Sequence, residues 1–115
     1  MQKNIYGKTS EIIASNFLKQ KGYKILATNY KNKIGEIDII AKDKKTIVFI
    51  EVKARNSKAF GHPFEAIDSE KQLKIRRVAE LYLITKHLTE SPCRFDAISI
   101  LGTEDYEIEH IENAF

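Results

Sequence analysis

Asp38, Glu51 and Lys53 are charged residues in two segments that have the pattern of β-strands. In these segments the other residues either alternate between polar and apolar types or form a continuous apolar stretch. Side chains alternate between the two faces of a strand, so Glu51 and Lys53 share a face. If the two segments pair as a hairpin that turns at Lys44-Lys45, Asp38 lies opposite Glu51. Opposed like charges destabilise a sheet unless a cation or a shared proton compensates. Two carboxylates beside a lysine suit a hard divalent cation and an attacking water.

The register of this hairpin is an assumption, but the conclusion that Asp38 and Glu51 share a face depends only on whether the numbers of paired residues add up to an odd or an even sum. Any register of the same parity keeps Asp38 and Glu51 on one face, whereas the other parity separates them. The alternative interpretation is a surface hairpin with solvated charges, in which Glu36 forms an ion pair with Lys53.

A helix is predicted from about Tyr6 to Lys21, where apolar residues recur at helical spacing and Gly22 supplies a left-handed cap. Glu11 lies three residues before Ala14 and seven before Leu18, at the edge of the apolar stripe. Its carboxylate is therefore expected to face the sheet.

A second helix is predicted to open at Ser69, which forms a capping-box pattern with Gln72, and to run to about Lys86. Lys71 lies four residues before Ile75, on the inward side of the first turn. A snorkelling or rim position is the alternative for both Lys71 and the carboxylate of the first helix. Taken together, the charged residues of strands and helices are expected to converge.

The remaining pattern predicts five strands and one domain over residues 1–115. The expected strands are Tyr23 to Tyr30, Ile34 to Ala41, Thr46 to Ala54, Arg94 to Leu101 and Tyr106 to Ile111. A strand meander after one helix, with a second helix crossing over to two more strands, predicts an α/β fold with a mixed sheet flanked by helices. The Ile47 to Ile50 stretch predicts burial on both faces of its strand.

Composition narrows the class of protein. The chain has 115 residues, 43% of them hydrophobic, which suits one compact domain and excludes a multidomain machine. Its net charge of +3 permits a polyanionic partner without demanding one. Cys93 is the single cysteine, which favours a reducing compartment. Without an apolar signal core or a spanning stretch, the chain is expected in the cytoplasm and away from the membrane.

Asp38 followed by Glu51-Val52-Lys53 resembles the PD-(D/E)xK signature of restriction-endonuclease-like nucleases. Over nearly its whole length the chain is similar to the YraN family of small bacterial proteins, predicted endonucleases related in pattern to archaeal Holliday-junction resolvases. The matching segments are Gly7 with Glu11 and Ala14, Leu18 through Gly22-Tyr23, Asn29-Tyr30, Gly35 to Ile40, Val48 to Lys53, Phe60-Gly61, Lys71, Arg94-Phe95-Asp96 and Asn113-Ala114-Phe115.

The resemblance implies a restriction-endonuclease-like fold and a role for each matching residue. Asp38, Glu51 and the Val52 carbonyl would ligate Mg²⁺ or Mn²⁺, and Lys53 would position the nucleophilic water. Glu11 would bind or orient a second metal or its waters. Lys71 would replace the Gln or Lys that follows the signature in that superfamily. The expected products are a 5′-phosphate and a 3′-hydroxyl.

The expected partner is DNA. Basic residues fit a phosphate-binding rim, which comprises Arg55, Lys58, Lys74 and Arg77, with Lys42, Lys44, Lys45 and Arg76 as further members. No base-reading element is evident, so recognition of DNA shape such as a branch, flap or junction is expected, in recombination or repair. Cutting both arms of a junction would require a homodimer, and the sequence leaves the oligomeric state open.

Other residues stay with open alternatives. The segment Asn56 to Glu65 contains His62, which could act on a leaving group but has no evident partner. Arg94 and Asp96 favour an ion pair over a nucleic-acid contact. The competing functions are a non-catalytic nucleic-acid-binding or adaptor module that keeps the acidic pocket, and a purely structural domain.

Overall fold

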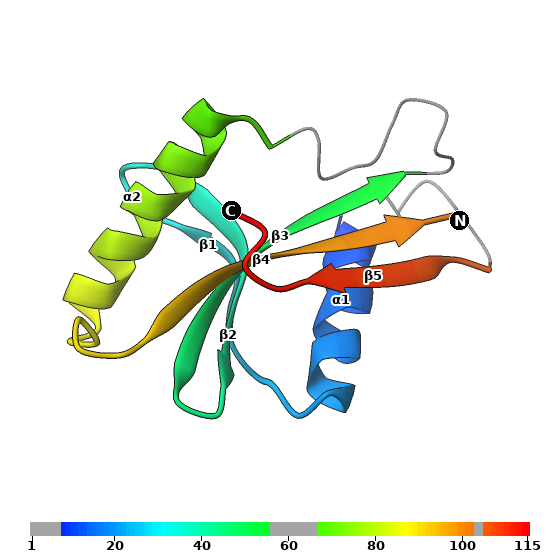
Figure 1. Cartoon of the computed structure of the whole chain (residues 1–115), viewed down its shortest axis with the longest axis horizontal. Helices are drawn as coiled ribbons and strands as arrows, with labels where there is room; N and C mark the ends of the chain where they lie inside the picture. The colour runs from blue at the N-terminus through cyan, green and yellow to red at the C-terminus, as the bar shows by residue number, and fades with distance from the viewer. Residues whose placement is uncertain (1–7, 56–66, 103–104) are drawn as a thin grey trace.

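The computed structural model describes residues 8–55, 67–102 and 105–115, and within them it has the predicted order of helix, three strands, helix and two strands (Figure 1). The elements are α1 (Lys8–Gln20), β1 (Lys24–Lys31), β2 (Glu36–Asp43), β3 (Thr46–Arg55), α2 (Ser69–Thr85), β4 (Cys93–Leu101) and β5 (Glu107–Ile111). The predicted α/β class is confirmed.

The five strands form one mixed sheet in the order β1-β2-β3-β4-β5. All neighbouring pairs are antiparallel except β3 and β4, which α2 connects as a parallel crossover. The sheet separates α2 from α1, as the two helices on either side of it in Figure 1 show. The central strand β3 therefore lies between two layers of helix.

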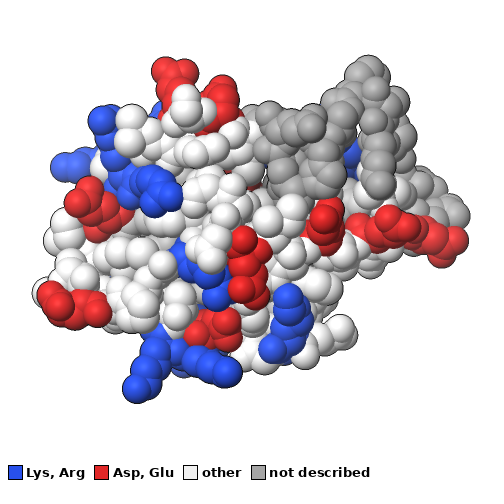
Figure 2. Space-filling view, in the orientation of Figure 1, with Lys and Arg blue, Asp and Glu red and all other residues white. Residues whose placement is uncertain are grey.

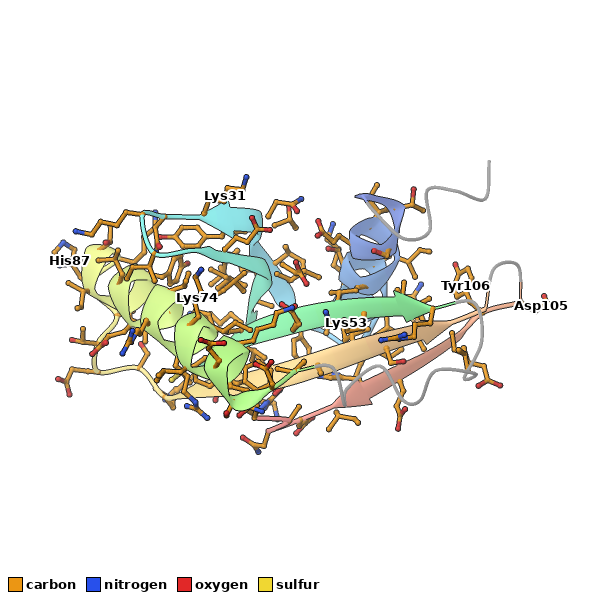
Figure 3. All side chains as sticks on the ribbon, turned by 90° about the horizontal axis from the view of Figure 1, so that it is seen from above. Lys31, Lys53, Lys74, His87, Asp105 and Tyr106 are labelled. Atoms are coloured by element: carbon orange, nitrogen blue, oxygen red, sulfur yellow. The ribbon has the colours of Figure 1, made fainter. Side chains whose placement is uncertain are left out.

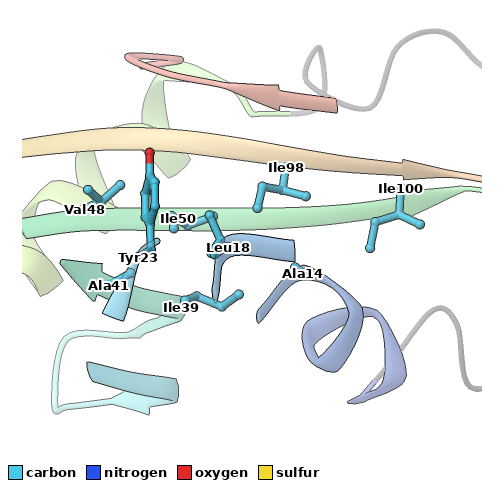
Figure 4. Close-up of a cluster of buried hydrophobic side chains, with 9 residues drawn as sticks. All are labelled: Ala14, Leu18, Tyr23, Ile39, Ala41, Val48, Ile50, Ile98 and Ile100. Carbon is cyan, nitrogen blue, oxygen red and sulfur yellow. The ribbon is translucent and has the colours of Figure 1, made fainter. Parts of the chain in front are cut away.

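Each helix covers its own hydrophobic cluster. The cluster on the α1 face is built from Ala14, Leu18, Tyr23, Ile39, Ala41, Val48, Ile50, Ile98 and Ile100 (Figure 4). The cluster on the α2 face contains Phe49, Ile75, Val78, Tyr82 and Phe95 among others. Alternate residues of β3 enter the two clusters, so Ile47 to Ile50 is buried on both faces, as predicted.

The helix ends follow from local backbone chemistry. Gly22 adopts φ +94°, and the N–H of Tyr23 donates to the Leu18 carbonyl at 3.0 Å, which ends α1 in the left-handed cap that the sequence predicts. The predicted cap of α2 is wrong by one residue: Asp68, not Ser69, is the N-cap, and its Oδ1 accepts from the Lys71 N–H at 2.8 Å. Aspartate is among the preferred N-cap residues, because its carboxylate accepts from the free N–H groups of the first turn.

The β2–β3 hairpin has the register that the sequence analysis assumed. The ladder runs from Asp43–Thr46 to Ile39–Ile50, with Lys44 at φ +58° in the tight turn. One step further along, the same register would oppose Asp38 and Glu51. In the described part of the chain, neither helix is long and apolar enough to cross a lipid bilayer.

Candidate active site

Asp38 lies where the ladder between β2 and β3 ends. Instead of a backbone pair, the N–H of Val52 donates to Asp38 Oδ2 at 2.8 Å. The carboxylate thus takes over a hydrogen bond that a continuing sheet would make with backbone. It is held in a fixed position beside Glu51, as the parity argument predicts, and the two carboxyl groups interact electrostatically.

Glu51 is 7% exposed and lies against two ammonium groups. Lys71 Nζ, from the first turn of α2, is 2.6 Å from Glu51 Oε2, and Lys53 Nζ is 3.8 Å from the same oxygen. Figure 3 shows Lys53 on β3, between α2 and α1. The predicted convergence of β3 with the first turn of α2 is therefore present.

Glu11 brings the third carboxylate from α1. Its side chain hydrogen-bonds Asn29 and Asp38, and its charge interacts with that of Glu51. Its Oε1 is buried and has no hydrogen-bond partner among the described residues. A buried carboxylate oxygen without a donor is costly, so this atom has capacity for a ligand.

Asn29 belongs to this cluster, and the sequence analysis gave it no role beyond a matching family position. It adopts φ +51° in β1, a conformation that asparagine tolerates better than most residues. The Asn type in a strand pattern was the only signal in the sequence that pointed to it.

Burial and crowding change the protonation of the acidic groups. Burial, with a contribution from Glu51, raises the pKa of Asp38 to about 7, although the Val52 N–H opposes the rise. Burial also raises the pKa of Glu11, and the charges of Glu36 and Glu51 add to that rise. A cation bound between closely spaced carboxylates would favour their ionised forms, so it would be stabilised at this position.

The pKa values of Lys53 and Lys71 are shifted in opposite directions. Burial lowers the pKa of Lys53, and the ammonium of Lys71 beside it lowers it further. Burial opposes the charge of Lys71 too, but its hydrogen bonds with Glu51 and Lys53 and the charges of Glu51 and Asp38 together outweigh this and raise the pKa of Lys71. Of the pair, Lys53 is the better proton acceptor and Lys71 the persistent cation.

The carboxylates of Asp38, Glu51 and Glu11 are of the type that binds a hard divalent cation, but they are not arranged as a complete metal site. Within residues 8–55, 67–102 and 105–115, no three His, Cys, Asp or Glu side chains are close enough together to hold a metal. Oxygen donors from Asp38, Glu51 and the unpartnered Glu11 Oε1 nevertheless match the ligands that Mg²⁺ and Mn²⁺ prefer. The Val52 carbonyl stays a predicted ligand.

Glu36 does not form the alternative ion pair with Lys53. It is exposed and lies 3.8 Å from Lys31 Nζ, on the neighbouring strand β1. The hairpin therefore differs from the surface arrangement with a Glu36–Lys53 bridge.

Two of the predicted phosphate-binding residues lie next to the three carboxylates of Glu11, Asp38 and Glu51, which we call the acidic cluster. Lys74 and Arg77 line a hollow of about 640 Å³ together with Lys71. Arg55 is half-buried at the end of β3, and Lys58 and His62 lie outside the described residues. On the face drawn in Figure 2, acidic and basic side chains are interspersed and form no continuous basic field.

The predicted ion pair of Arg94 and Asp96 is present and belongs to a larger buried network. Arg94 Nε donates to Asp96 Oδ1 at 2.9 Å, and Asp96 is fully buried. The ring of His110 lies 2.8 Å from Asp96 Oδ2, and Arg94 also donates to the Tyr23 hydroxyl at 2.7 Å. The network ties β4 and β5 to Tyr23, the residue before β1, which gives these residues a structural role.

Comparison with known proteins places the chain among relatives of the same size. A family model described as "Uncharacterised protein family UPF0102" matches residues 10–100. A UPF0102 protein of Alkaliphilus oremlandii is 49% identical over 118 residues and aligns over 100% of both chains. UPF0102 proteins of Clostridioides difficile and Chlorobium phaeobacteroides are 48% and 46% identical, over 95% of this chain and 95% and 92% of theirs.

Proposed function

The chain belongs to the UPF0102 family, also called the YraN family, and we propose that it is a metal-dependent nuclease that hydrolyses DNA phosphodiester bonds. The observation that carries the proposal is the buried Glu51 at the end of the β2–β3 ladder, with Asp38 on one side and two lysines on the other. Hydrolysis of a phosphodiester needs such a combination of anionic metal ligands and cations.

Asp38, Glu51 and Glu11 would hold Mg²⁺ or Mn²⁺, which supplies charge neutralisation at the phosphate and a more acidic water. Fixing the Asp38 carboxylate through the Val52 N–H pre-organises one ligand before substrate arrives. Glu11, with an oxygen that has no partner among the described residues, offers a further ligand or a hydrogen-bond acceptor for a metal-bound water.

Lys53 is the residue proposed to orient the attacking water and accept its proton. Burial and the neighbouring Lys71 lower the pKa of Lys53, which makes its amine easier to deprotonate than that of a solvated lysine. Lys71 keeps its charge and would stabilise the negative charge that develops on the phosphate. The two lysines thus divide the tasks of base and electrostatic stabiliser.

DNA is the proposed substrate because three cations, Lys71, Lys74 and Arg77, line the hollow next to the acidic cluster. Asp68 and Glu70 also line this hollow. Lys74 and Arg77 on α2 would contact phosphates on one side of the scissile bond. These contacts carry no sequence information, which favours selection by DNA shape, such as a branch or junction. We place this activity in the cytoplasm and assign it to recombination or repair, with a homodimer required to cut a symmetric junction in both arms.

The test is cleavage of labelled linear, flapped and four-way-junction DNA with Mg²⁺ or Mn²⁺. Wild type is compared with Asp38→Asn and Lys53→Ala, and with Lys86→Ala at the far end of α2 as the matched control. Wild type and Lys86→Ala are expected to cleave, while both site variants lose cleavage and remain folded. Equal cleavage in all four proteins, or none in any, contradicts the proposal for these substrates.

A second candidate function is a nucleic-acid-binding module without catalysis. It is favoured by the 2.6 Å Lys71–Glu51 contact, in which an ammonium already compensates the buried carboxylate. Such a module would bind DNA through its basic residues and would not change when Asp38 is replaced. Binding assays on Asp38→Asn separate the two functions.

A further inference from the structure

A hollow between α1 and β1 shares Glu11 with the candidate active site. It has a volume of about 260 Å³ and is separate from the hollow beside α2. Ligand pockets for drug-sized molecules usually run from about 300 to 1,000 Å³, so this one suits a smaller group. None of the roles assigned above uses it.

The lining combines apolar surface with amide and ammonium groups. Ile12 is 56% exposed and, with Ile25, offers an apolar wall. Asn16 and Asn29 contribute amide groups, which both donate and accept hydrogen bonds, and Lys19 adds a cation. A flat heterocycle with polar edges, attached to a phosphate, matches all three kinds of group at once.

The backbone of β1 is irregular where it forms the wall of this hollow. The register with β2 shifts between Ile25 and Ala27, and Asn29 has φ +51°. Ile25 and Thr28, which regular alternation would place on opposite faces, both line the hollow as a result. Asn29 is also hydrogen-bonded to Glu11, so the wall of the hollow and the acidic cluster are joined directly.

We propose that this hollow binds the nucleoside adjacent to the scissile phosphate, with the base against Ile12 and Ile25 and its polar edge at Asn16 and Asn29. The proposal rests on the proposed nuclease function and names the part of the substrate that the α1 side of the site would take. Stacking on an apolar wall accepts any base, because every base has a π-face.

The spacing along α1 sets how far the ammonium of Lys19 lies from the acidic cluster. Glu11 and Lys19 are eight residues apart on the same helix, which at 1.5 Å per residue separates them by about 12 Å. Neighbouring phosphates of one strand are closer together than this, so a strand whose scissile phosphate lies at the acidic cluster would place its next base in the hollow and a phosphate further along the strand near Lys19. An isolated phosphate site would make no use of the apolar wall.

The experiment is an amide-resolved NMR titration of the full chain with each of the four 5′-deoxynucleoside monophosphates, without divalent metal. Deoxyribose 5-phosphate is the probe without a base. The expected result is that nucleotides shift the amides of residues 11–19 and 25–29, whereas the sugar phosphate does not. Shifts confined to α2, no shifts, or equal shifts with the sugar phosphate would overturn the proposal.

Ile12→Asp is the decisive variant, and Ile84→Asp is its control, because Ile84 is 53% exposed on α2. Loss of the stacking wall is expected to weaken nucleotide binding at least about fivefold in Ile12→Asp and leave it unchanged in Ile84→Asp. Equal affinity in both, with far-UV circular dichroism unchanged, contradicts the assignment.

The titration is independent of cleavage, so the two proposals can fail separately. A wild-type protein that binds there but cleaves no DNA refutes the nuclease alone. One that cleaves with the expected metal dependence but binds no nucleotide in the hollow refutes this inference alone.

Discussion

Lys71 Nζ lies 2.6 Å from Glu51 Oε2, so an ammonium from α2 occupies one oxygen of the carboxylate that is proposed to bind metal. The N-cap at Asp68 fixes the backbone of Lys71 through the N–H that it accepts. A cation that binds this oxygen must share it with Lys71 or displace the ammonium, and one that binds the other oxygen still lies close to the same positive charge. Metal binding and the position of Lys71 are expected to be coupled.

Lys71→Met is expected to bind Mn²⁺ more tightly while cleaving DNA more slowly. Removing the competing ammonium should lower the dissociation constant for Mn²⁺ roughly three- to tenfold, because a partly exposed ion pair is worth about 1 kcal/mol. Isothermal titration calorimetry measures the affinity, with Lys86→Met as control. An unchanged dissociation constant would show that Lys71 does not compete with the ion.

Asp38→Asn is expected to stabilise the metal-free protein, and to do so more at high pH. The folded-state pKa of about 7 is above the ordinary value of 3.8, so the contribution of Asp38 to the stability of the wild type is greatest below pH 3.8 and is lost as the pH rises through 7. Asparagine keeps an acceptor for the Val52 N–H without the charge. Urea unfolding in EDTA should show a gain of about 1–3 kcal/mol at pH 8.5 and a smaller one at pH 5. A gain independent of pH would mean that the Asp38 charge is already compensated.

Arg94→Met is expected to destabilise the protein strongly, by about 3–5 kcal/mol, because it leaves Asp96 buried without its cation. Burial disfavours ionised Asp96, but hydrogen bonds from His110 and Arg94 outweigh this and lower the pKa of Asp96. The stabilisation is complete above the ordinary value of 3.8 and is lost as the pH falls through the lower folded-state pKa. Denaturant titration at pH 7 and pH 3 measures both effects, and a variant as stable as wild type at pH 7 would contradict them.

Lys74→Ala and Arg77→Ala are each expected to weaken DNA binding uniformly across sequences. Each should reduce the slope of log K against log salt by about 1, as loss of one phosphate contact does. Fluorescence anisotropy over a salt series, with Ca²⁺ in place of Mg²⁺, measures the slope. Lys86→Ala, at the C-cap of the same helix, should keep the wild-type slope, and a loss as large as in the other two would point to a diffuse charge effect.

The sequence predicted those parts of the fold and site that depend on local pattern. Period-2 alternation and the Lys44-Lys45 turn were sufficient for the β2–β3 register, and helical spacing placed Lys71 towards Glu51. The Asp38 contact with the Val52 N–H could not be predicted, because a ladder pattern does not show where two strands separate.

Contacts between distant segments were also beyond the sequence patterns. His110 reaches Asp96 across the β4–β5 pair, and nothing in the local pattern of β5 indicates that partner. Asn29 meets Glu11 because β1 is irregular, and a bulge leaves little trace in alternation. Both cases depend on a long-range contact that a spacing argument does not contain.

The hydrogen bond from the Val52 N–H to Asp38 also links the geometry of the candidate active site to correct pairing of β2 with β3. A slip of one residue between β2 and β3 would give this carboxylate a different neighbour and turn Asp38 away from Glu51. A chain in which β2 and β3 pair in the wrong register would therefore bind no metal at this site and would also be less stable. The stoichiometry of metal binding in a purified sample would then count the molecules whose strands are paired correctly.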